Sequence, residues 1–477
     1  MPALMWFRSD LRTRDNPALR AACDACDDGV IALWLVTPGQ WREHDLGGNK
    51  IDFLLRNVAA LSKELAKINI PLLVREANSF NDVPHVVYRT VREHEIDAVY
   101  ANREHEWNER QRDDHVAERL GKHDVPFRLF TDQCVFDPGT LLTGQEKFYS
   151  VFTPFKKSWY RRWKEDGGLD AYAPSDKPGP RPGLDVEPSE VPASVDGFEP
   201  QIDASCWPAG EAHAKRRLES FVESRIESYD EDRDTPSIDG TSSLSPYLAS
   251  GVVSLRQCIA AAIGANQNKV DAGKTGVVGW VNELIWREFY KHVLIGFPRV
   301  SRGRAFKPET ERIEWKNDSS ALEAWKEGRT GYPIVDAAMR QLRETGWMHN
   351  RMRMVTAMFL TKDLFLDWRL GERHFMNLLV DGDLSANNGG WQWSASTGTD
   401  AQPYFRVFNP WTQGKKFDPE GEYIRRYCPE LGDVEPKFLH DMTGFPSDRR
   451  DEIGYPEPVV EHAEARDHAI EAFKALK

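Results

Sequence analysis

The sequence predicts an α/β domain with a parallel sheet, followed by a large, mainly helical part. Up to about residue 130, short apolar runs alternate with helical stretches, and strands spaced by helices are typical of a parallel sheet. Beyond about residue 200, strand signals fade and helical patterns dominate. We therefore expect an α/β domain over 1–130, an interdomain linker over 131–200 and a helical domain over 201–477.

Five apolar runs are the candidate strands, in the order Ala3–Phe7, Val30–Val36, Pro71–Val74, Ala98–Tyr100 and Phe127–Phe130. No GxGxxG follows the first run, so the sheet is expected to be Rossmann-like without the usual dinucleotide site. From about 170 to 200 the sequence is rich in proline, which predicts an extended connection.

Length, cysteine content and the lack of long apolar runs limit the kinds of protein that this chain can be. The 477 residues are enough for two or more core-forming units, and the six cysteines are scattered, which favours a reducing compartment. Cys23 and Cys26 form a CxxC, but no second Cys or His pair accompanies it, so packing is the favoured interpretation and no metal site is expected. The N-terminus lacks the features of a signal peptide, and no apolar run approaches about 18 residues. We expect a cytoplasmic protein without a membrane span.

The formal net charge of -13 argues at first against DNA binding, because phosphate affinity comes from lysine and arginine. A local basic face can still steer DNA toward an acidic protein. Basic residues gather in three places: Lys156, Lys157, Arg161, Arg162 and Lys164; Arg299, Arg302, Arg304 and Lys307; and Arg351, Arg406, Lys415 and Lys416. The first group is more typical of ordinary solvated charge.

Three blocks combine aromatic and polar residues: WVNELIWREFY, TGWMHNRMRM and DGDLSANNGGWQWSASTGTD. The first lacks glycine and proline from Asn282 onward and predicts a helix. On that helix Trp280, Glu283 and Arg287 share one stripe, with Trp286 about a turn beyond Glu283. The alternative is a solvated ion pair between Glu283 and Arg287. The two further blocks favour a cavity for a flat ligand with polar edges.

In the second block, helical spacing places Trp347, Asn350, Arg351 and Met354 on one face. Arg353 points elsewhere and needs an anion.

The third block offers Asp381 and Asp383 as that anion. They are expected in a glycine-rich turn before Asn387, Asn388 and the Gly389–Gly390 pair, where glycine permits close approach to a ligand. A surface Asx turn is the alternative for DGD alone.

These motifs resemble those of class I cyclobutane pyrimidine dimer (CPD) DNA photolyases, in the photolyase and cryptochrome family. The resemblance runs from end to end, through MWFRSDLRTRDNPAL, EWNER, GTSSLSPYLASG, NELIWREFY, GYPIVDAAMRQLRETGWMHNRMRM and DGDLSANNGGWQWSASTGTDAQPYFRVFNP. It implies a light-driven lyase that repairs pyrimidine dimers in UV-damaged DNA, with FAD as cofactor and the monomer as the working unit.

The resemblance implies which residues hold FAD. The phosphate and ribityl side falls to Tyr229, Thr241, Ser242, Leu244 and Ser245. The remainder falls to Trp280, Arg287, Asn350, Arg353, Asp381, Asp383 and Asn387. Asn387 stands where the family places a residue against the flavin N5, and a neutral amide there favours the reduced states.

The resemblance also implies that the lesion is flipped out of the duplex into the cavity. Glu283, Asn350, Met354 and Asn387 would carry the chemistry, and Trp286 and Trp393 would pack on the dimer. Light would excite the reduced cofactor FADH-, and one electron would pass to the dimer and return after the ring splits. Arg233, Arg351 and Arg406 would bind the phosphates around the lesion.

Trp391, Trp368 and Trp315 match the family's three tryptophans that relay an electron to oxidised flavin. As isolated residues they would more often be core packing.

A light-harvesting antenna is also implied. Asn108 and Glu109 match positions that touch a folate, 5,10-methenyltetrahydrofolate, and Arg302 stands where folate binders usually carry lysine. Deazaflavin or no antenna are the alternatives.

Other functions fit less well. A cryptochrome would share the fold, but Asn387, Met354, Glu283 and Trp286 favour repair. A (6-4) photolyase would carry histidines in place of Asn350 and Met354. A flavin oxidoreductase that does not use light, or a bare DNA-binding module, would not need the whole set of motifs.

Overall fold

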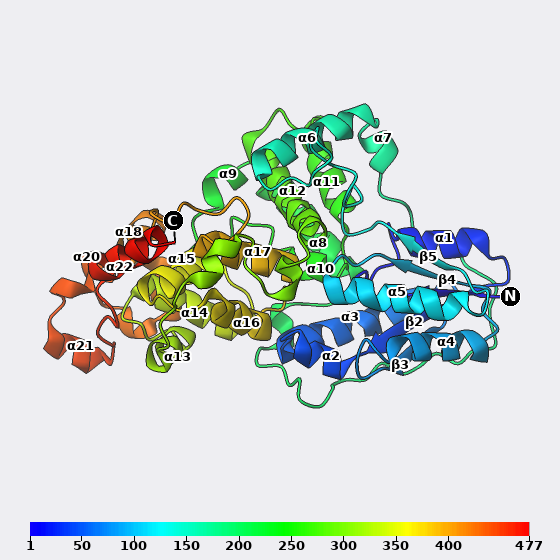
Figure 1. Ribbon diagram of the computed structural model, residues 1–477, viewed down its shortest axis with the longest axis horizontal. Helices are drawn as coiled ribbons and strands as arrows, with labels where there is room; N and C mark the ends of the chain where they lie inside the picture. The colour runs from blue at the N-terminus through cyan, green and yellow to red at the C-terminus, as the bar shows by residue number, and fades with distance from the viewer. Residues whose placement is uncertain (477) are drawn as a thin grey trace. The chain divides into compact units, whose positions relative to one another are not determined.

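The computed structural model describes residues 1–476, which form two compact units (Figure 1). Unit 1 consists of Met1–Pro200, Ala204–Glu227 and Ser242–Pro298. Unit 2 consists of Gln201–Asp203, Ser228–Thr241 and the residues from 299 onward. Each unit is therefore built from segments that are separated in the sequence. The expected division at residues 130 and 200 stays a prediction.

Unit 1 contains the predicted five-stranded parallel sheet. Its strands are β1 (Ala3–Trp6), β2 (Val30–Val36), β3 (Leu72–Glu76), β4 (Ala98–Asn102) and β5 (Phe127–Phe130). They are arranged in the order β3-β2-β1-β4-β5, and every pair is parallel. Strands β1, β2 and β4 are buried throughout, which explains their largely apolar sequences, whereas β3 at the edge of the sheet is buried only at its first two residues.

Helices cover this sheet (Figure 1): α1 (Pro17–Ala25), α2 (Pro38–Glu43), α3 (Gly48–Ala66), α4 (Val83–Glu93) and α5 (Trp107–Gly121). Asn16 caps α1 by accepting a hydrogen bond from the Leu19 N–H, and proline follows at the first helical position. Leu4, Ile31 and Val99 lie in the apolar core between the layers.

Further helices complete unit 1: α6 (Phe152–Glu165), α7 (Leu169–Tyr172), a 3₁₀ turn η1 (Ala204–Cys206), α8 (Glu211–Ser224), α10 (Ser245–Ala249), α11 (Leu255–Gly264) and α12 (Thr275–Gly296). Helix α6 lies inside the stretch expected to be a linker, because Phe155 and Trp159 bury their rings. The proline-rich part between Tyr172 and Ala204 has no helix or strand, as its composition predicts. Glu288 anchors α12 by accepting hydrogen bonds from the Val135 and Phe136 N–H groups.

Unit 2 is helical, as predicted. Its elements are α9 (Tyr229–Asp232), η2 (Val300–Arg302), η3 (Pro308–Arg312), α13 (Ser319–Glu327), α14 (Pro333–Thr345), α15 (Asn350–Met358), the π-helical turn η4 (Phe359–Asp363), α16 (Trp368–Leu378), α17 (Leu384–Ala395), α18 (Pro410–Phe417), α19 (Glu422–Tyr427), η5 (Pro429–Leu431), α20 (Pro436–Leu439), η6 (Met442–Gly444), α21 (Ser447–Ile453) and α22 (His462–Lys474). A parallel β-bridge joins Lys316 to Leu366.

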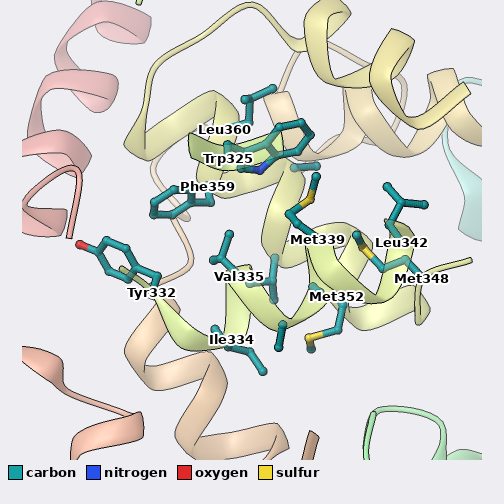
Figure 2. Close-up of a cluster of buried hydrophobic side chains, with 14 of the residues drawn as sticks. Trp325, Tyr332, Ile334, Val335, Met339, Leu342, Met348, Met352, Phe359 and Leu360 are labelled. Atoms are coloured by element: carbon teal, nitrogen blue, oxygen red, sulfur yellow. The ribbon is translucent and has the colours of Figure 1, made fainter. Parts of the chain in front are cut away.

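The core of unit 2 forms around α14 (Figure 2). Val335, Met339 and Leu342 of this helix are fully buried and lie in one cluster with Trp325 and Met352. The flexible side chains of Met339, Met348 and Met352 belong to the same cluster. This packing fixes α15, which begins five residues after α14 ends.

A buried carboxylate anchors the start of α14. Asp336 accepts hydrogen bonds from the N–H and hydroxyl of Thr330, from the Gly331 N–H and from the Tyr455 hydroxyl, which lies 2.5 Å away. The site is fully buried, so all of these donors depend on one acceptor group.

We predict that Asp336→Ala lowers the free energy of unfolding by about 3 kcal/mol or more, because each buried donor left without an acceptor costs about 1–3 kcal/mol. Tyr455→Phe removes a donor together with its bond and should cost about 1 kcal/mol. Urea unfolding of both variants measures the difference. Equal losses in the two variants would contradict the prediction.

Candidate functional site

The first aromatic and polar block forms part of α12 in unit 1, as predicted. Trp280 is buried and packs on Phe221, with ring centroids 5.0 Å apart. Glu283, Trp286 and Arg287 are partly exposed along the helix. This stripe therefore presents a carboxylate, an indole and a guanidinium together.

Trp286 stacks on an aromatic partner that its sequence spacing does not reveal. Its ring lies 3.7 Å from that of Phe152 at an interplanar angle of 10°. Phe289 and Tyr290 complete the aromatic surroundings, each 5.6 Å from Trp286. The stack fixes the plane of Trp286. It places the apolar indole at the edge of the stripe that Glu283, Trp286 and Arg287 form on α12.

The segment before α10 supplies hydroxyl groups to unit 1. Ser242 and Ser245 are half-buried, Leu244 is buried, and Ser243 takes a left-handed conformation with φ 48. The guanidinium of Arg287 donates to the Leu248 carbonyl at 3.3 Å, which ties this segment to α12. Unit 1 thus brings together Ser242, Leu244, Ser245 and the α12 residues.

In unit 2, α15 begins later than the sequence spacing predicted. His349 caps the helix because its Nδ1 accepts from the Arg351 N–H, so the first helical residue is Asn350. The expectation that Trp347 shares the helical face is wrong, since Trp347 lies in the connection after Gly346. Asn350 and Met354 do lie one turn apart on α15.

The predicted ion pair between Arg353 and Asp381 is confirmed. The guanidinium donates to Asp381 Oδ2 at 2.8 Å and also to the Met348 carbonyl at 2.8 Å. Asp381 is 6% exposed, and its Oδ1 has no hydrogen-bond partner among the described residues. A buried carboxylate oxygen without a donor is a place for a donor from a ligand.

The third block begins with the expected turn and continues as a helix: Asp381 and Asp383 lie in the connection between α16 and α17. Asp383 caps α17 by accepting from the Ala386 N–H at 3.1 Å, so the residues from Leu384 onward are helical. Asn387, Asn388 and the two following glycines are helical, because the cap and packing against α15 and α16 outweigh the low helix propensity of glycine.

A hydrogen bond fixes the amide of Asn387. Its NH2 group donates to the Glu372 carbonyl at 2.9 Å. A carbonyl accepts only from the nitrogen side of an amide, so the Asn387 oxygen is left for other groups. The neighbouring Asn388 donates to the Glu372 carboxylate at 2.8 Å and accepts from Gln392 at 2.9 Å.

The three predicted relay tryptophans all lie in unit 2. Trp391 is one helical turn after Asn387 on α17, and Trp368 begins α16, which packs against α17. Trp315 lies beside the segment before α16: its ring is 5.1 Å from that of Phe365, and the Lys316 N–H donates to the Phe365 carbonyl. Trp391 and Trp368 are buried, and Trp315 is partly exposed.

Arg351 is held by two partners that the sequence analysis missed. Its guanidinium donates to both oxygens of Asp234, at 2.6 and 3.2 Å, and lies 4.6 Å from the Phe417 ring centroid. Arg233 precedes Asp234 and lies over the buried Tyr229 ring. Unit 2 therefore gathers two of the predicted phosphate-binding arginines at one segment.

The remaining predicted residues are dispersed. Trp393 is half-buried on α17, Arg406 is exposed in the following loop, and Arg302 is exposed at η2. Thr241 is half-buried at the edge of its segment. Among residues 1–476, no three His, Cys, Asp or Glu side chains form a group that could hold a metal ion.

A polar cluster surrounds the predicted antenna residues of unit 1. Asn108 lies 3.0 Å from His44 Nε2, and Glu109 lies 3.5 Å from His44 Nδ1. Burial, together with the nearby Glu106 and Glu104 carboxylates, raises the pKa of Glu109 to about 8. Burial also lowers the pKa of His44. Both side chains are thus neutral near pH 7, and the Glu109 carboxyl can donate a hydrogen bond.

The usual ligand position of a doubly wound sheet is occupied by the chain itself. Such ligands bind beyond the carboxyl ends of the strands where the strand order reverses, here between β1 and β4. Asn102 at the end of β4 donates to Asp10 at 2.6 Å and to Asn16 at 2.8 Å, and all three are buried. These polar groups satisfy one another.

Two family models cover most of the chain. A model described as DNA photolyase matches residues 3–178, and one described as the FAD binding domain of DNA photolyase matches residues 280–475. The deoxyribodipyrimidine photo-lyases of Salmonella typhimurium and Escherichia coli are each 44% identical to this chain, over 99% of it and 98% of their own length.

Solved structures of photolyases and a cryptochrome are similar in fold to this chain. A class III photolyase from Agrobacterium tumefaciens superposes with a TM-score of 0.89 at 33% identity, over 100% of this chain and 97% of that one. A cryptochrome from Synechocystis has a TM-score of 0.87 at 25% identity, over 99% of both chains. An archaeal photolyase from Sulfolobus tokodaii with two FAD molecules has a TM-score of 0.80 at 31% identity, over 100% of both chains.

Glu109 should make folding stability depend on pH. The folded state keeps its proton up to a pKa of about 8, whereas the ordinary value is 4.5, so stability falls as the pH rises between these values. We predict that Glu109→Gln removes this loss, by at most about 1.4 kcal/mol per pH unit. Urea unfolding at pH 5 and pH 8 measures it.

Glu118→Gln, at an exposed position of the same helix, is the matched control and should retain the slope of the wild type. Parallel curves for wild type and Glu109→Gln would contradict the prediction.

Proposed function

Because this chain belongs to the DNA photolyase family, we propose that it is a light-dependent lyase that repairs cyclobutane pyrimidine dimers in DNA. The observation that carries the proposal is 44% identity to deoxyribodipyrimidine photo-lyases over 99% of the chain. The residues of α12, α15 and α17 that this reaction needs are all present.

FAD fits the chemistry of the polar groups described above. Asp381 Oδ1 is a buried acceptor without a donor among the described residues, and Asn387, six residues later, keeps its carbonyl oxygen available. Reduced FAD, when bound and excited by light, supplies the electron that splits the cyclobutane ring. We propose that Tyr229, Thr241, Ser242, Leu244, Ser245, Trp280, Arg287, Asn350, Arg353, Asp381, Asp383 and Asn387 hold it.

The lesion would meet apolar rings and one carboxyl group. Trp286 and Trp393 offer ring faces, Met354 a soft thioether, and Glu283 and Asn350 groups that hydrogen-bond a base edge. Extrusion of a damaged, poorly stacked pair costs only a few kcal/mol. The role of these side chains is to position the dimer and exclude water.

Arg233, Arg351 and Arg406 would bind backbone phosphates, so they set affinity and its salt dependence rather than specificity. Trp391, Trp368 and Trp315 would pass an electron inward from the surface. The burial of the first two and the partial exposure of Trp315 support that direction.

For the antenna we propose 5,10-methenyltetrahydrofolate near Asn108 and Glu109, with Arg302 as its third expected contact. The neutral Glu109 carboxyl can donate to a heterocycle nitrogen, which supports this choice. Asp10, Asn16 and Asn102 bond to one another beyond the carboxyl ends of β1 and β4, which is an argument against a second nucleotide or deazaflavin there. The monomeric state and the cytoplasmic location stay predictions; no helix within residues 1–476 is long and apolar enough to cross a membrane.

The function is tested by illuminating the purified, chemically reduced protein with an oligonucleotide that contains a thymine dimer and following the return of the thymine absorbance. Repair only under light is expected. Glu283→Ala should retain its flavin but repair about two- to tenfold less, the size of one hydrogen bond of about 0.5–1.5 kcal/mol. Glu283→Gln, which keeps a hydrogen-bonding group, should lose less. Full repair by Glu283→Ala would disprove its role, and bound flavin without any repair in the wild type would favour a light sensor.

Asn387→Asp should destabilise the reduced cofactor, because a like charge at about 4 Å costs up to about 4 kcal/mol at an effective dielectric constant of about 20. We expect reoxidation in air to become at least about tenfold faster. Asn377→Asp is the control, since Asn377 makes the same kind of bond, to the Arg373 carbonyl, at an exposed position of α16. Equal reoxidation rates in Asn387→Asp and wild type would rule out this role.

A further inference from the structure

A glycine inside α16 lies where any side chain would collide with Trp391. An ideal Cβ at Gly371 would lie 2.0 Å from Cη2 and 2.4 Å from Cζ3 of that indole. Carbon atoms in contact rest about 3.5–4.0 Å apart. The six-membered ring of Trp391 therefore lies directly against the backbone of α16.

The neighbours of Gly371 on the same helical face are aromatic. Trp368 is three residues before it and Phe375 four residues after it, so all three lie on one face of α16. The Phe375 ring lies 5.0 Å from that of Trp391 at an interplanar angle of 81°. Trp391 thus occupies a notch in α16, between the turn that begins at Trp368 and the turn that ends at Phe375.

Helix formation does not explain this glycine. Alanine is more favourable than glycine inside a helix, so a glycine there needs a packing reason. The collision distance to Trp391 supplies that reason. Leu360 Cδ2, at 2.7 Å from the ideal Cβ, is the end of a flexible side chain and could yield.

We propose that Gly371 is a positioning residue for the electron relay: its missing side chain lets Trp391 lie against the helical turn that carries Trp368. The inference rests on the proposed function. In the relay, Trp391 gives an electron to the light-excited oxidised cofactor, Trp368 refills Trp391, and Trp315 refills Trp368. A soluble thiol refills Trp315 and is itself oxidised, so the electrons balance.

A methyl group at position 371 would push the indole away by about 1.5 Å to reach normal contact. Electron transfer between two side chains slows as the gap between their rings widens, although less steeply than a reaction that forms a bond. The Trp368 to Trp391 step should therefore be slower in Gly371→Ala, whereas repair by chemically reduced protein does not use that step.

The contact between Gly371 and Trp391 is tested first by a double-mutant cycle that measures unfolding in urea and needs no activity assay. Gly371→Ala should lower the unfolding midpoint when Trp391 is present. In the Trp391→Phe background, where the ring no longer reaches the notch, the same change should leave the midpoint unchanged or raise it. Gly264→Ala, in α11 with open space around its Cβ, is the control and should not lower the midpoint. An equal drop in both backgrounds would overturn the contact.

The relay is tested by the rate at which blue light reduces the bound flavin in the presence of a thiol. We expect photoreduction of Gly371→Ala to be several-fold slower than that of the wild type, with repair by the chemically reduced variant close to wild type. An unchanged photoreduction rate overturns the proposal, and so does a parallel loss of repair. If Gly371→Ala does not fold, Gly371→Ala with Leu360→Val relieves one contact and keeps the collision with Trp391. A wild type that never repairs under light would refute the proposed function, while the urea cycle would still decide the contact.

Discussion

The ion pair between Arg353 and Asp381 is the interaction on which the rest of the unit 2 site depends. It joins the second turn of α15 to the residues just before α17, and the Met348 carbonyl holds the same guanidinium from the other side. A buried carboxylate is costly unless a charge or donor meets it. Arg353 meets one oxygen of Asp381, and the other oxygen has no hydrogen-bond partner among the described residues. The pair therefore ties α15 to the connection before α17 and leaves a buried acceptor that suits the proposed cofactor.

Because α17 starts at a fixed place, its later residues are fixed as well. Asp383 caps the helix, Asn387 follows one turn later with its amide held by the Glu372 carbonyl, and Trp391 follows one turn after that. Helix α16 meets this face twice, through Glu372 at Asn387 and through Gly371 at Trp391. One pair of helices thus orients both the amide expected at the cofactor and Trp391, the first tryptophan of the proposed relay. Such groups are more precisely placed on helices than on loops.

Strands and helices that depend only on the local pattern of residues were predictable from the sequence. The five strands are apolar runs of the right length, and α12 follows from helix formers without a break. The partner of Arg353 was predictable because an unpaired guanidinium needs an anion. What failed depends on tertiary context: a histidine caps α15 and excludes Trp347 from it. Sequence patterns also did not reveal that packing keeps two glycines helical in α17. The stack of Phe152 on Trp286 joins distant segments, and no spacing rule reveals it.

The contacts of Arg351 bear on how a protein with this negative net charge would bind DNA. With a net charge of -13, the protein repels DNA at long range, so binding depends on local arginines. Arg351 is already paired with Asp234 and stacked on Phe417. The pairing orders its side chain before DNA arrives, but a phosphate must share the guanidinium with a carboxylate. A paired arginine therefore adds less affinity for any phosphate than an unpaired one. If Arg351 binds a backbone phosphate as proposed, its contribution is common to intact and damaged DNA, so discrimination depends on contacts to the lesion itself.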